Sequence, residues 1–208
     1  FLSKNIKINI IKEKINTQLP NNLVIKKASI NSKTINKDDI FFAIKGNSID
    51  GNKFISKAIE KGSKIIVSEQ KIKDYRNGIL FIRTKNIRKL LAEVSFKIYN
   101  KIPKNLVAVT GTNGKSSVAE FYLQIMQLNK KKVASIGTLG VKSKNINLNL
   151  FNTTTDPINL GQILQKLKKE KVDNVIMEAS SHGLKQYRLD GLSFKSGIFT
   201  NLSQDHLD

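Results

Sequence analysis

The residues best suited to chemistry lie in one short glycine-containing segment, Gly111-Thr-Asn-Gly-Lys-Ser116. It follows the apolar run 106–110 and precedes a helical pattern, so backbone N–H groups and a helix N-terminus can point at one anion. Lys115 would reach terminal phosphates and the Ser116 hydroxyl would ligate Mg²⁺, as in a P-loop. The full P-loop pattern has glycine where this chain has Val109, so the loop is a shortened variant. An ordinary glycine turn is the alternative, but Lys-Ser at a helix start favours phosphate binding.

Two further side chains could hold a metal ion. Glu178 ends the apolar run 175–177, which is typical of a buried strand, and Mg²⁺ prefers carboxylate and phosphate oxygens. A strand-end carboxylate can instead cap a helix, but a phosphate loop on an adjacent strand favours the metal role. His206 lies in the acidic segment 205–208 and is either a second metal ligand or part of a solvated tail.

A polar cluster follows in the segment 180–188, SSHGLKQYR. Ser181 and His182 are sequence neighbours, and neighbours rarely aim their side chains at each other, so a hydrolase with this pair is disfavoured. Arg188 could form a surface ion pair with Asp190. The segment is better suited to holding an anionic, hydroxyl-rich substrate through three side chains: Ser180, Gln186 and Arg188.

The segment 152–157, NTTTDP, offers hydroxyl and amide groups to a ligand through Asn152, Thr153 and Thr154. Taken alone, it is typical of a turn followed by a helix cap, with Asp156 or Asn159 beginning the helix.

The elements that would position these residues form an α/β fold. After residue 102, apolar strand patterns alternate with helical patterns, which predicts right-handed crossovers and an open parallel sheet. Ligands on such sheets bind at the carboxyl ends of the strands, and the candidate segments fall there. The predicted strands are 106–110, 133–137, 172–180 and 197–202, and the predicted helices run from the glycine loop to residue 128 and from about 159 to 170.

The part before the boundary mixes strands and helices. A proline in Lys101-Ile-Pro-Lys104 follows a helical pattern and separates the two parts. We therefore expect a small mixed α/β domain over residues 1–102 and a P-loop-type parallel-sheet domain over residues 103–208. The first has strand candidates at 24–30, 38–44, 64–68 and 79–83, and helix candidates at 52–61 and 87–99.

The composition of the chain limits the kinds of partner that it is expected to bind. The formal net charge is +20, yet only four of the 36 basic residues are Arg. Arg is the residue that forms bidentate hydrogen bonds to bases and phosphates. A lysine excess along the whole chain therefore indicates composition bias rather than a specific nucleic-acid site. No apolar run approaches the roughly 18–20 residues that span a bilayer, and the N-terminus lacks the apolar centre of a secretory signal. Without cysteine there is no disulfide or thiolate chemistry. We expect a cytoplasmic, monomeric protein without membrane insertion.

Five motifs stand in an order that resembles the Mur ligases: TGTNGKSS, SIGTLG, NTTTDP, MEASSHGLKQYR and FTNLSQDHLD. Upstream, Ser29-Ile-Asn-Ser-Lys33 and residues 39–46 resemble the UDP-binding domain of the same family. The resemblance implies an ATP-dependent amide ligase of peptidoglycan precursor synthesis. Its substrates would be UDP-N-acetylmuramoyl-L-alanyl-D-glutamate and a diamino acid, with meso-2,6-diaminopimelate preferred over lysine, and the reaction would pass through an acyl phosphate.

Site roles follow from the resemblance. ATP would bind Gly111, Thr112, Asn113, Gly114, Lys115, Ser116 and Ser117. Ser116 and Glu178 would bind the first Mg²⁺ ion, and His206 would bind the second metal ion. Lys115, Glu178 and His206 would be catalytic. The muramoyl-peptide substrate would contact Ser32, Asn152, Thr153, Thr154, Ser180, Gln186 and Arg188.

Other members of the wider class remain as alternatives. Folylpolyglutamate synthetase and the ligase half of cyanophycin synthetase share the TGTNGK turn, although SSHGLKQYR and the upstream domain weigh against both. A lysine-rich P-loop protein that binds RNA or DNA is the alternative from another class. The family's carbamylated lysine and amino-acid-selecting domain follow the DHLD motif, so the resemblance implies a fragment with an incomplete ATP domain and no ligase turnover by itself.

Overall fold

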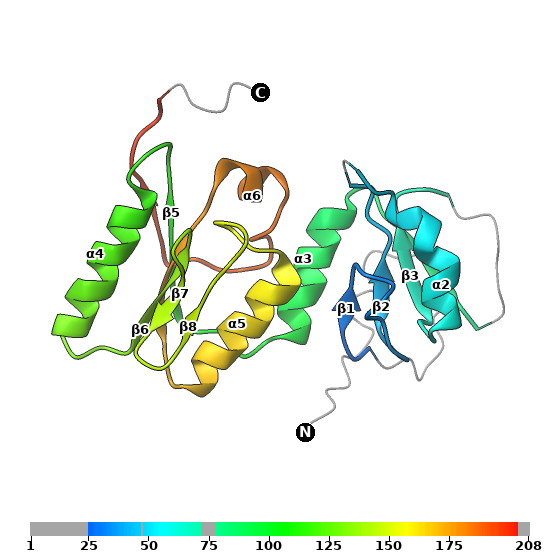
Figure 1. Cartoon of the computed structure of the whole chain (residues 1–208), viewed down its shortest axis with the longest axis horizontal. Helices are drawn as coiled ribbons and strands as arrows, with labels where there is room; N and C mark the ends of the chain where they lie inside the picture. The colour runs from blue at the N-terminus through cyan, green and yellow to red at the C-terminus, as the bar shows by residue number, and fades with distance from the viewer. Residues whose placement is uncertain (1–24, 47, 72–77, 204–208) are drawn as a thin grey trace. The chain divides into compact units, whose positions relative to one another are not determined.

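The computed structural model describes residues 25–46, 48–71 and 78–203. The chain divides into two compact units, Phe1–Ile98 and Tyr99–Asp208. Each is an α/β structure built on its own sheet, and the predicted fold class is confirmed (Figure 1). Among the described residues, no helix combines the length and apolar character needed to cross a membrane.

The first unit contains a four-stranded parallel sheet in the order β1-β2-β3-β4. Its strands are β1 (Ala28–Ser29), β2 (Ile40–Phe42), β3 (Ile65–Ser68) and β4 (Leu80–Arg83). Every predicted strand is present, but each is shorter than its apolar pattern. All residues of β2 and β3 are buried, as expected for central strands of a parallel sheet.

Helices of the first unit match the predicted segments closely. The segment predicted as one helix begins as a 3₁₀ turn, η1 (Gly51–Phe54), and continues as α2 (Ile55–Glu60). Ala58 of α2 packs with Phe41 and Ile66 in the apolar core. The last helix is α3 (Ile87–Ile98), whose apolar stripe is buried.

The second unit contains a six-stranded sheet in the order β10-β5-β9-β6-β7-β8. The first four strands in this order are parallel: β10 (Ser196–Phe199), β5 (Asn105–Thr110), β9 (Asn174–Glu178) and β6 (Val133–Gly137). The prediction of an open parallel sheet holds for these four. Strands β5 and β9 are neighbours, which was the assumption behind assigning Glu178 to a metal site.

Two antiparallel strands extend the sheet beyond the prediction: β7 (Gly140–Ser143) and β8 (Asn147–Leu148). The turn between β6 and β7 closes with Gly137 paired to Gly140, and Gly140 has a φ of 87°, a conformation that favours glycine. Strands β7 and β8 are short and contain polar residues, so they lack the continuous apolar run that marks the central strands. For this reason the sequence pattern did not reveal them.

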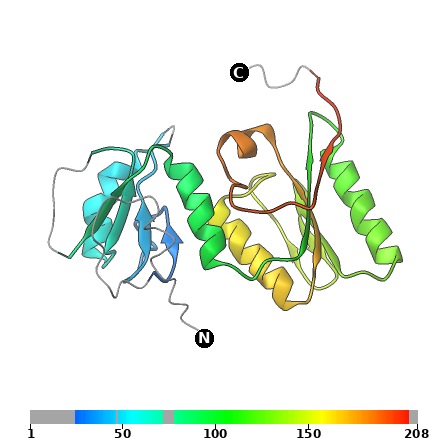
Figure 2. The ribbon, with the colours of Figure 1, turned by 180° about the vertical axis from the view of Figure 1, so that it is seen from behind.

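Helices cover both faces of the second sheet. Figures 1 and 2 show α4 (Lys115–Leu128) on one face and α5 (Pro157–Lys169) on the other. Ala119 of α4 packs on Val109 and Ile176 of the sheet. Asp156 caps α5 by accepting hydrogen bonds from two backbone N–H groups, so the helix begins at Pro157 rather than at residue 159.

Candidate functional site

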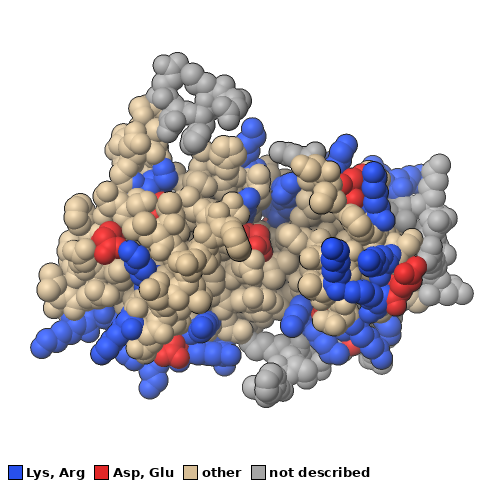
Figure 3. Space-filling view, viewed as in Figure 1, with Lys and Arg blue, Asp and Glu red and all other residues tan. Residues whose placement is uncertain are grey.

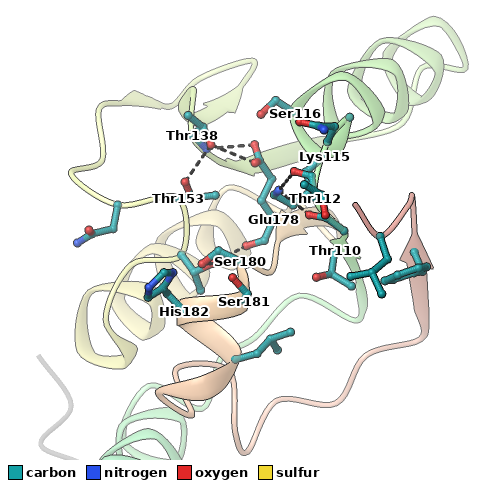
Figure 4. A pocket seen from close by; sticks show the side chains of 18 of the residues that line it. Thr110, Thr112, Lys115, Ser116, Thr138, Thr153, Glu178, Ser180, Ser181 and His182 are labelled. Carbon is teal, nitrogen blue, oxygen red and sulfur yellow. Dashed lines mark hydrogen bonds between the residues drawn. The ribbon is translucent and has the colours of Figure 1, made fainter. Parts of the chain in front are cut away.

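One cavity of the second unit, of about 860 Å³, collects most of the predicted site residues. It lies at the carboxyl ends of β5 and β9, where the sequence placed it (Figure 4). The cavity is lined by Gly111, Thr112, Asn113, Gly114, Lys115, Ser116, Ser117, Asn152, Thr153, Thr154, Glu178, Ser180, Gln186 and Arg188, among others. Segments up to 93 positions apart in the sequence, from Thr110 to Ser203, therefore line one cavity.

One predicted site residue that the structure describes, Ser32, does not line this cavity. Ser32 belongs to the first unit, where its side chain is buried in the turn 31–34 after β1. His206 lies outside the described residues, so its role as a metal ligand stays a prediction.

The glycine loop has the conformation of an anion-binding turn. Gly111 and Gly114 have φ values of 131° and 84°, which side chains with a Cβ rarely adopt. Helix α4 begins directly after Gly114, and no side chain caps its N-terminus. Its first N–H groups and the positive end of the helix dipole are therefore directed at the loop, where an anionic ligand can satisfy them.

Lys115 folds back over this loop. Its Nζ donates to the carbonyl oxygens of Gly111 at 2.7 Å and Thr112 at 2.8 Å. These two bonds hold the ammonium group on the cavity side of the loop (Figure 4). A cation positioned by the loop that also presents the N–H groups is suited to a phosphate group.

The segment after β10 holds the loop from the other side. Thr200 Oγ1 donates to the carbonyl oxygen of Asn113 at 2.7 Å, and Asn113 N donates to Asn201 Oδ1 at 3.0 Å. Thr112 N also donates to the Asn201 carbonyl at 3.0 Å. A Cβ on Gly111 would lie 2.1 Å from Thr200 Oγ1, so the close approach of the two segments requires glycine there. Thr200 and Asn201 were not among the predicted site residues, although both belong to the motif FTNLSQDHLD.

Glu178 is the buried acid of the site. It is 3% exposed, and its carboxylate lies at the end of β9 beside the turn after β6. Thr138 N donates to Oε1 at 3.1 Å and Thr138 Oγ1 donates to Oε2 at 3.1 Å. A Cβ on Gly137 would lie 2.1 Å from Oε1, so this glycine leaves the space that the carboxylate occupies. Thr138 was not among the predicted site residues, and its position in SIGTLG at a strand end was the available signal.

The donor set fits Mg²⁺. The Ser116 hydroxyl stands at the first turn of α4 and the Glu178 carboxylate faces the same cavity, so both are hard oxygen ligands of the type this ion prefers. Within the described part of the chain, no cluster of three or more His, Cys, Asp or Glu residues forms a metal centre by itself. A Mg²⁺ ion here would therefore share its coordination with phosphate oxygens and water, as is usual at nucleotide sites.

Thr154 joins the loop 152–157 to the end of β9. Its Oγ1 donates to the Glu178 carbonyl at 2.9 Å and accepts a hydrogen bond from Ser180 N at 2.9 Å. Ser180 caps α6 (Ser181–Lys185), where its Oγ accepts from Gly183 N at 3.1 Å. Thr154 is thus a buried structural link, and Ser180 stands where a helix begins.

Arg188 and Gln186 form a pair at the same cavity. Arg188 donates through Nε at 3.2 Å and through Nη2 at 2.8 Å to Gln186 Oε1, and Nη1 donates to the Thr154 carbonyl. The forked guanidinium is thereby held in one orientation, with its charge at the cavity lining.

The second unit is an α/β structure with a cavity at the carboxyl ends of its parallel strands. The uncapped helix after a glycine turn makes one side of this cavity suited to an anion, and a buried carboxylate stands on the neighbouring strand. Comparison with known families makes this specific. Residues 24–103 match the model described as Mur ligase family, catalytic domain, and residues 109–208 match the Mur ligase middle domain. The chain belongs to the Mur ligase family.

Two similar curated relatives share a name. A UDP-N-acetylmuramoyl-L-alanyl-D-glutamate--2,6-diaminopimelate ligase of Rickettsia bellii is 45% identical over 190 residues, which cover 88% of this chain and 38% of the relative. The ligase of the same name from Rickettsia prowazekii is 41% identical over 196 residues, covering 92% of this chain and 40% of the relative. The chain therefore spans about two fifths of the length of these relatives.

A solved structure supports the same grouping. A structure titled UDP-N-acetylmuramoyl-L-alanyl-D-glutamate--2,6-diaminopimelate ligase aligns with a TM-score of 0.82 at 26% identity. The alignment covers 97% of this chain and 41% of that chain.

Proposed function

We propose that this chain carries the nucleotide and muramoyl-peptide sites of an ATP-dependent ligase that joins 2,6-diaminopimelate to UDP-N-acetylmuramoyl-L-alanyl-D-glutamate. The observation that carries the proposal is the single cavity that gathers the loop 111–117, Glu178 and the polar groups of 152–154 and 180–188. The names of the relatives give the substrates.

The chemistry requires two anions to meet. The substrate carboxylate attacks the γ-phosphate of ATP, which gives an acyl phosphate and ADP, and the amine of the diamino acid then displaces phosphate to form the amide. Lys115 and the N-terminus of α4 offset the negative charge of the phosphates, and Arg188 offsets that of the substrate carboxylate. A Mg²⁺ ion held by Ser116 and Glu178, and a second metal ion held by His206, would neutralise charge on the phosphates.

Roles in the muramoyl-peptide half are proposed from the side chains that line the cavity. Asn152 and Thr153 present polar groups from the loop before α5, while Ser180, Gln186 and Arg188 present donors from the α6 side. Thr154 acts by fixing both segments to β9. In the first unit, the turn with Ser32 is proposed to hold the UDP part of the substrate.

Binding to nucleic acid is the alternative from another class. On the face seen in Figure 3, Lys and Arg side chains gather along the edge of the second unit where α4 and α5 end, and Lys166, Lys168 and Lys169 lie in the last turn of α5. This edge is opposite to the cavity at the carboxyl ends of β5 and β9. Lysines there would attract a polyanion without using the site, so we propose a cytoplasmic, monomeric enzyme with no specific nucleic-acid partner.

Paired titrations separate the two functions. The chain is titrated with UDP-N-acetylmuramoyl-L-alanyl-D-glutamate and, separately, with a labelled oligonucleotide as the salt concentration is raised. We expect saturable binding of the nucleotide-sugar that persists at physiological salt and oligonucleotide binding that falls steeply. Oligonucleotide binding that persists with no binding of the nucleotide-sugar would contradict the proposal.

A further inference from the structure

Three side chains form a continuous hydrogen-bonded row across the cavity. Thr138 Oγ1 lies 3.1 Å from Glu178 Oε2 and 3.0 Å from Thr153 Oγ1. The three residues come from the turn after β6, the end of β9 and the loop before α5. Figure 4 shows Thr138 between the other two, so one hydroxyl links the proposed metal side of the site to the proposed peptide side.

The direction of these hydrogen bonds follows from proton counting. An ionised carboxylate only accepts hydrogen bonds, so the Thr138 hydroxyl must donate its one proton to Glu178. The same hydroxyl can then only accept from Thr153, which must donate its own proton to Thr138. The lone pairs of Thr153 Oγ1 are left to face the cavity. Thr153 is therefore set to accept a hydrogen bond from a ligand.

Thr138 also fixes the carboxylate itself. Its backbone N–H binds Oε1 and its hydroxyl binds Oε2, so one residue holds both oxygens of Glu178. The absence of a side chain on Gly137 allows the carboxylate to approach this backbone. The remaining lone pairs of the two oxygens are the ones available to a metal ion.

We propose that Thr138 is a positioning residue that orients Glu178 and, through the same hydroxyl, sets Thr153 to accept a hydrogen bond from an N–H or O–H group of the peptide substrate. The proposal rests on the proposed function and deepens it. Thr153 selects a donor such as a peptide amide, whereas Arg188 on the other side of the cavity is suited to a carboxylate. Loss of the Thr138 hydroxyl consequently affects both halves of the site.

The test compares Thr138→Val, which removes the hydroxyl at similar volume, with Thr138→Ser, which keeps it. Thr84→Val is the matched control, because the Thr84 hydroxyl bonds to Asn86 N in the first unit. Two quantities are measured on the 208-residue chain: the Mg²⁺ concentration that half-saturates ATP binding, and the affinity for UDP-N-acetylmuramoyl-L-alanyl-D-glutamate. For Thr138→Val we expect the half-saturating Mg²⁺ concentration to rise about fivefold and the affinity for the nucleotide-sugar to fall about fivefold. Thr138→Ser and Thr84→Val should stay within about twofold of the wild type.

A ligand-free measurement keeps this proposal separate from the proposed function. Thr138→Val, Thr153→Val and the double variant are unfolded with urea. Because each single change breaks the same hydrogen bond, the loss of stability in the double variant should be smaller than the sum of the two single losses. Additive losses, or a Thr138→Ser variant as impaired as Thr138→Val, would overturn the role of the hydroxyl. If the wild type bound neither ATP nor the nucleotide-sugar while the losses were non-additive, the hydrogen-bonded row would stand, and the proposed function and the ligand role built on it would be wrong.

Discussion

Asn201 binds both backbone groups of Asn113 in the glycine loop. Its Oδ1 accepts a hydrogen bond from Asn113 N at 3.0 Å, and its Nδ2 donates to the Asn113 carbonyl at 3.3 Å. The two residues are 88 positions apart, so the segment after β10 completes a loop that the earlier part of the chain begins. The conformation of the glycine loop thus depends on the segment after β10 as well as on the glycines.

Replacing Asn201 with Ala should loosen the loop. Both side-chain bonds to Asn113 are lost, and each such bond contributes about 0.5–1.5 kcal/mol. We expect ATP to bind about tenfold more weakly, as measured by calorimetry. Asn129→Ala is the control, because Asn129 makes its side-chain bond to Ile125 O at the far end of α4. Equal ATP affinity in both variants would show that the loop does not need Asn201.

Gly137→Ala tests the space around Glu178. The added Cβ would stand 2.1 Å from Glu178 Oε1, so the carboxylate must move. We expect about 1–3 kcal/mol less stability to urea and about a tenfold greater Mg²⁺ requirement for ATP binding. Gly197→Ala is the matched control, because Gly197 lies in β10 of the same sheet and its added Cβ would have nothing within 4 Å. If both glycine variants behave alike, the close approach at Gly137 has no role in the site.

Arg188→Lys should affect one ligand only. Lysine keeps the charge but loses the fork that engages Gln186 and the Thr154 carbonyl. We expect about a tenfold weaker affinity for UDP-N-acetylmuramoyl-L-alanyl-D-glutamate and little change for ATP. Arg83→Lys in the first unit, whose side chain bonds to Glu69 O, is the control. A larger loss for ATP than for the nucleotide-sugar would place Arg188 in the wrong half of the site.

The buried carboxyl of Asp39 should make the free energy of unfolding of the first unit depend on pH. Burial raises the pKa of its carboxyl, outweighing the hydrogen bond from Asn36 N and the nearby Lys27. The folded chain therefore binds more protons than the unfolded chain between the ordinary pKa of about 4 and the raised value, and its free energy of unfolding falls as pH rises through that interval.

Asp39→Asn should abolish the decrease in the free energy of unfolding with rising pH. Asparagine keeps an acceptor for Asn36 N but carries no charge. In urea unfolding, the variant should be more stable than the wild type at pH 7, with the difference vanishing in acid. Asp50→Asn should show the opposite sign, since hydrogen bonds from Asn52 lower the pKa of Asp50 and stabilise its charged form. A constant difference between wild type and Asp39→Asn across the pH range would refute the role of Asp39.

Much of the fold was predictable because apolar periodicity reports burial. The apolar run 106–110 predicted β5 to within one residue, and the helical pattern 87–99 predicted α3 to within one residue. The hairpin of β7 and β8 was missed because its strands are short and polar, and its existence depends on pairing with β6.

The candidate site was predictable where the residue type coincides with the start of a helix, as at Lys115, or with the end of a strand, as at Glu178. Thr138 and Asn201 were missed because their roles arise from contacts over 40 and 88 positions of sequence. A threonine or an asparagine at a strand end indicates only that a polar group stands near the site. Only the packed sheet shows which carboxylate or loop it reaches.

The most direct test of the account is the binding of ATP with Mg²⁺ to the chain in the presence of UDP-N-acetylmuramoyl-L-alanyl-D-glutamate, comparing wild type with Lys115→Ala. A contact between a cation and a phosphate contributes about 1.5–3 kcal/mol, so we expect at least about a tenfold loss of ATP affinity in this variant. Lys131→Ala, an exposed lysine after α4, should bind as the wild type does. Unchanged ATP affinity in Lys115→Ala would contradict the assignment of the loop 111–117 as the phosphate site.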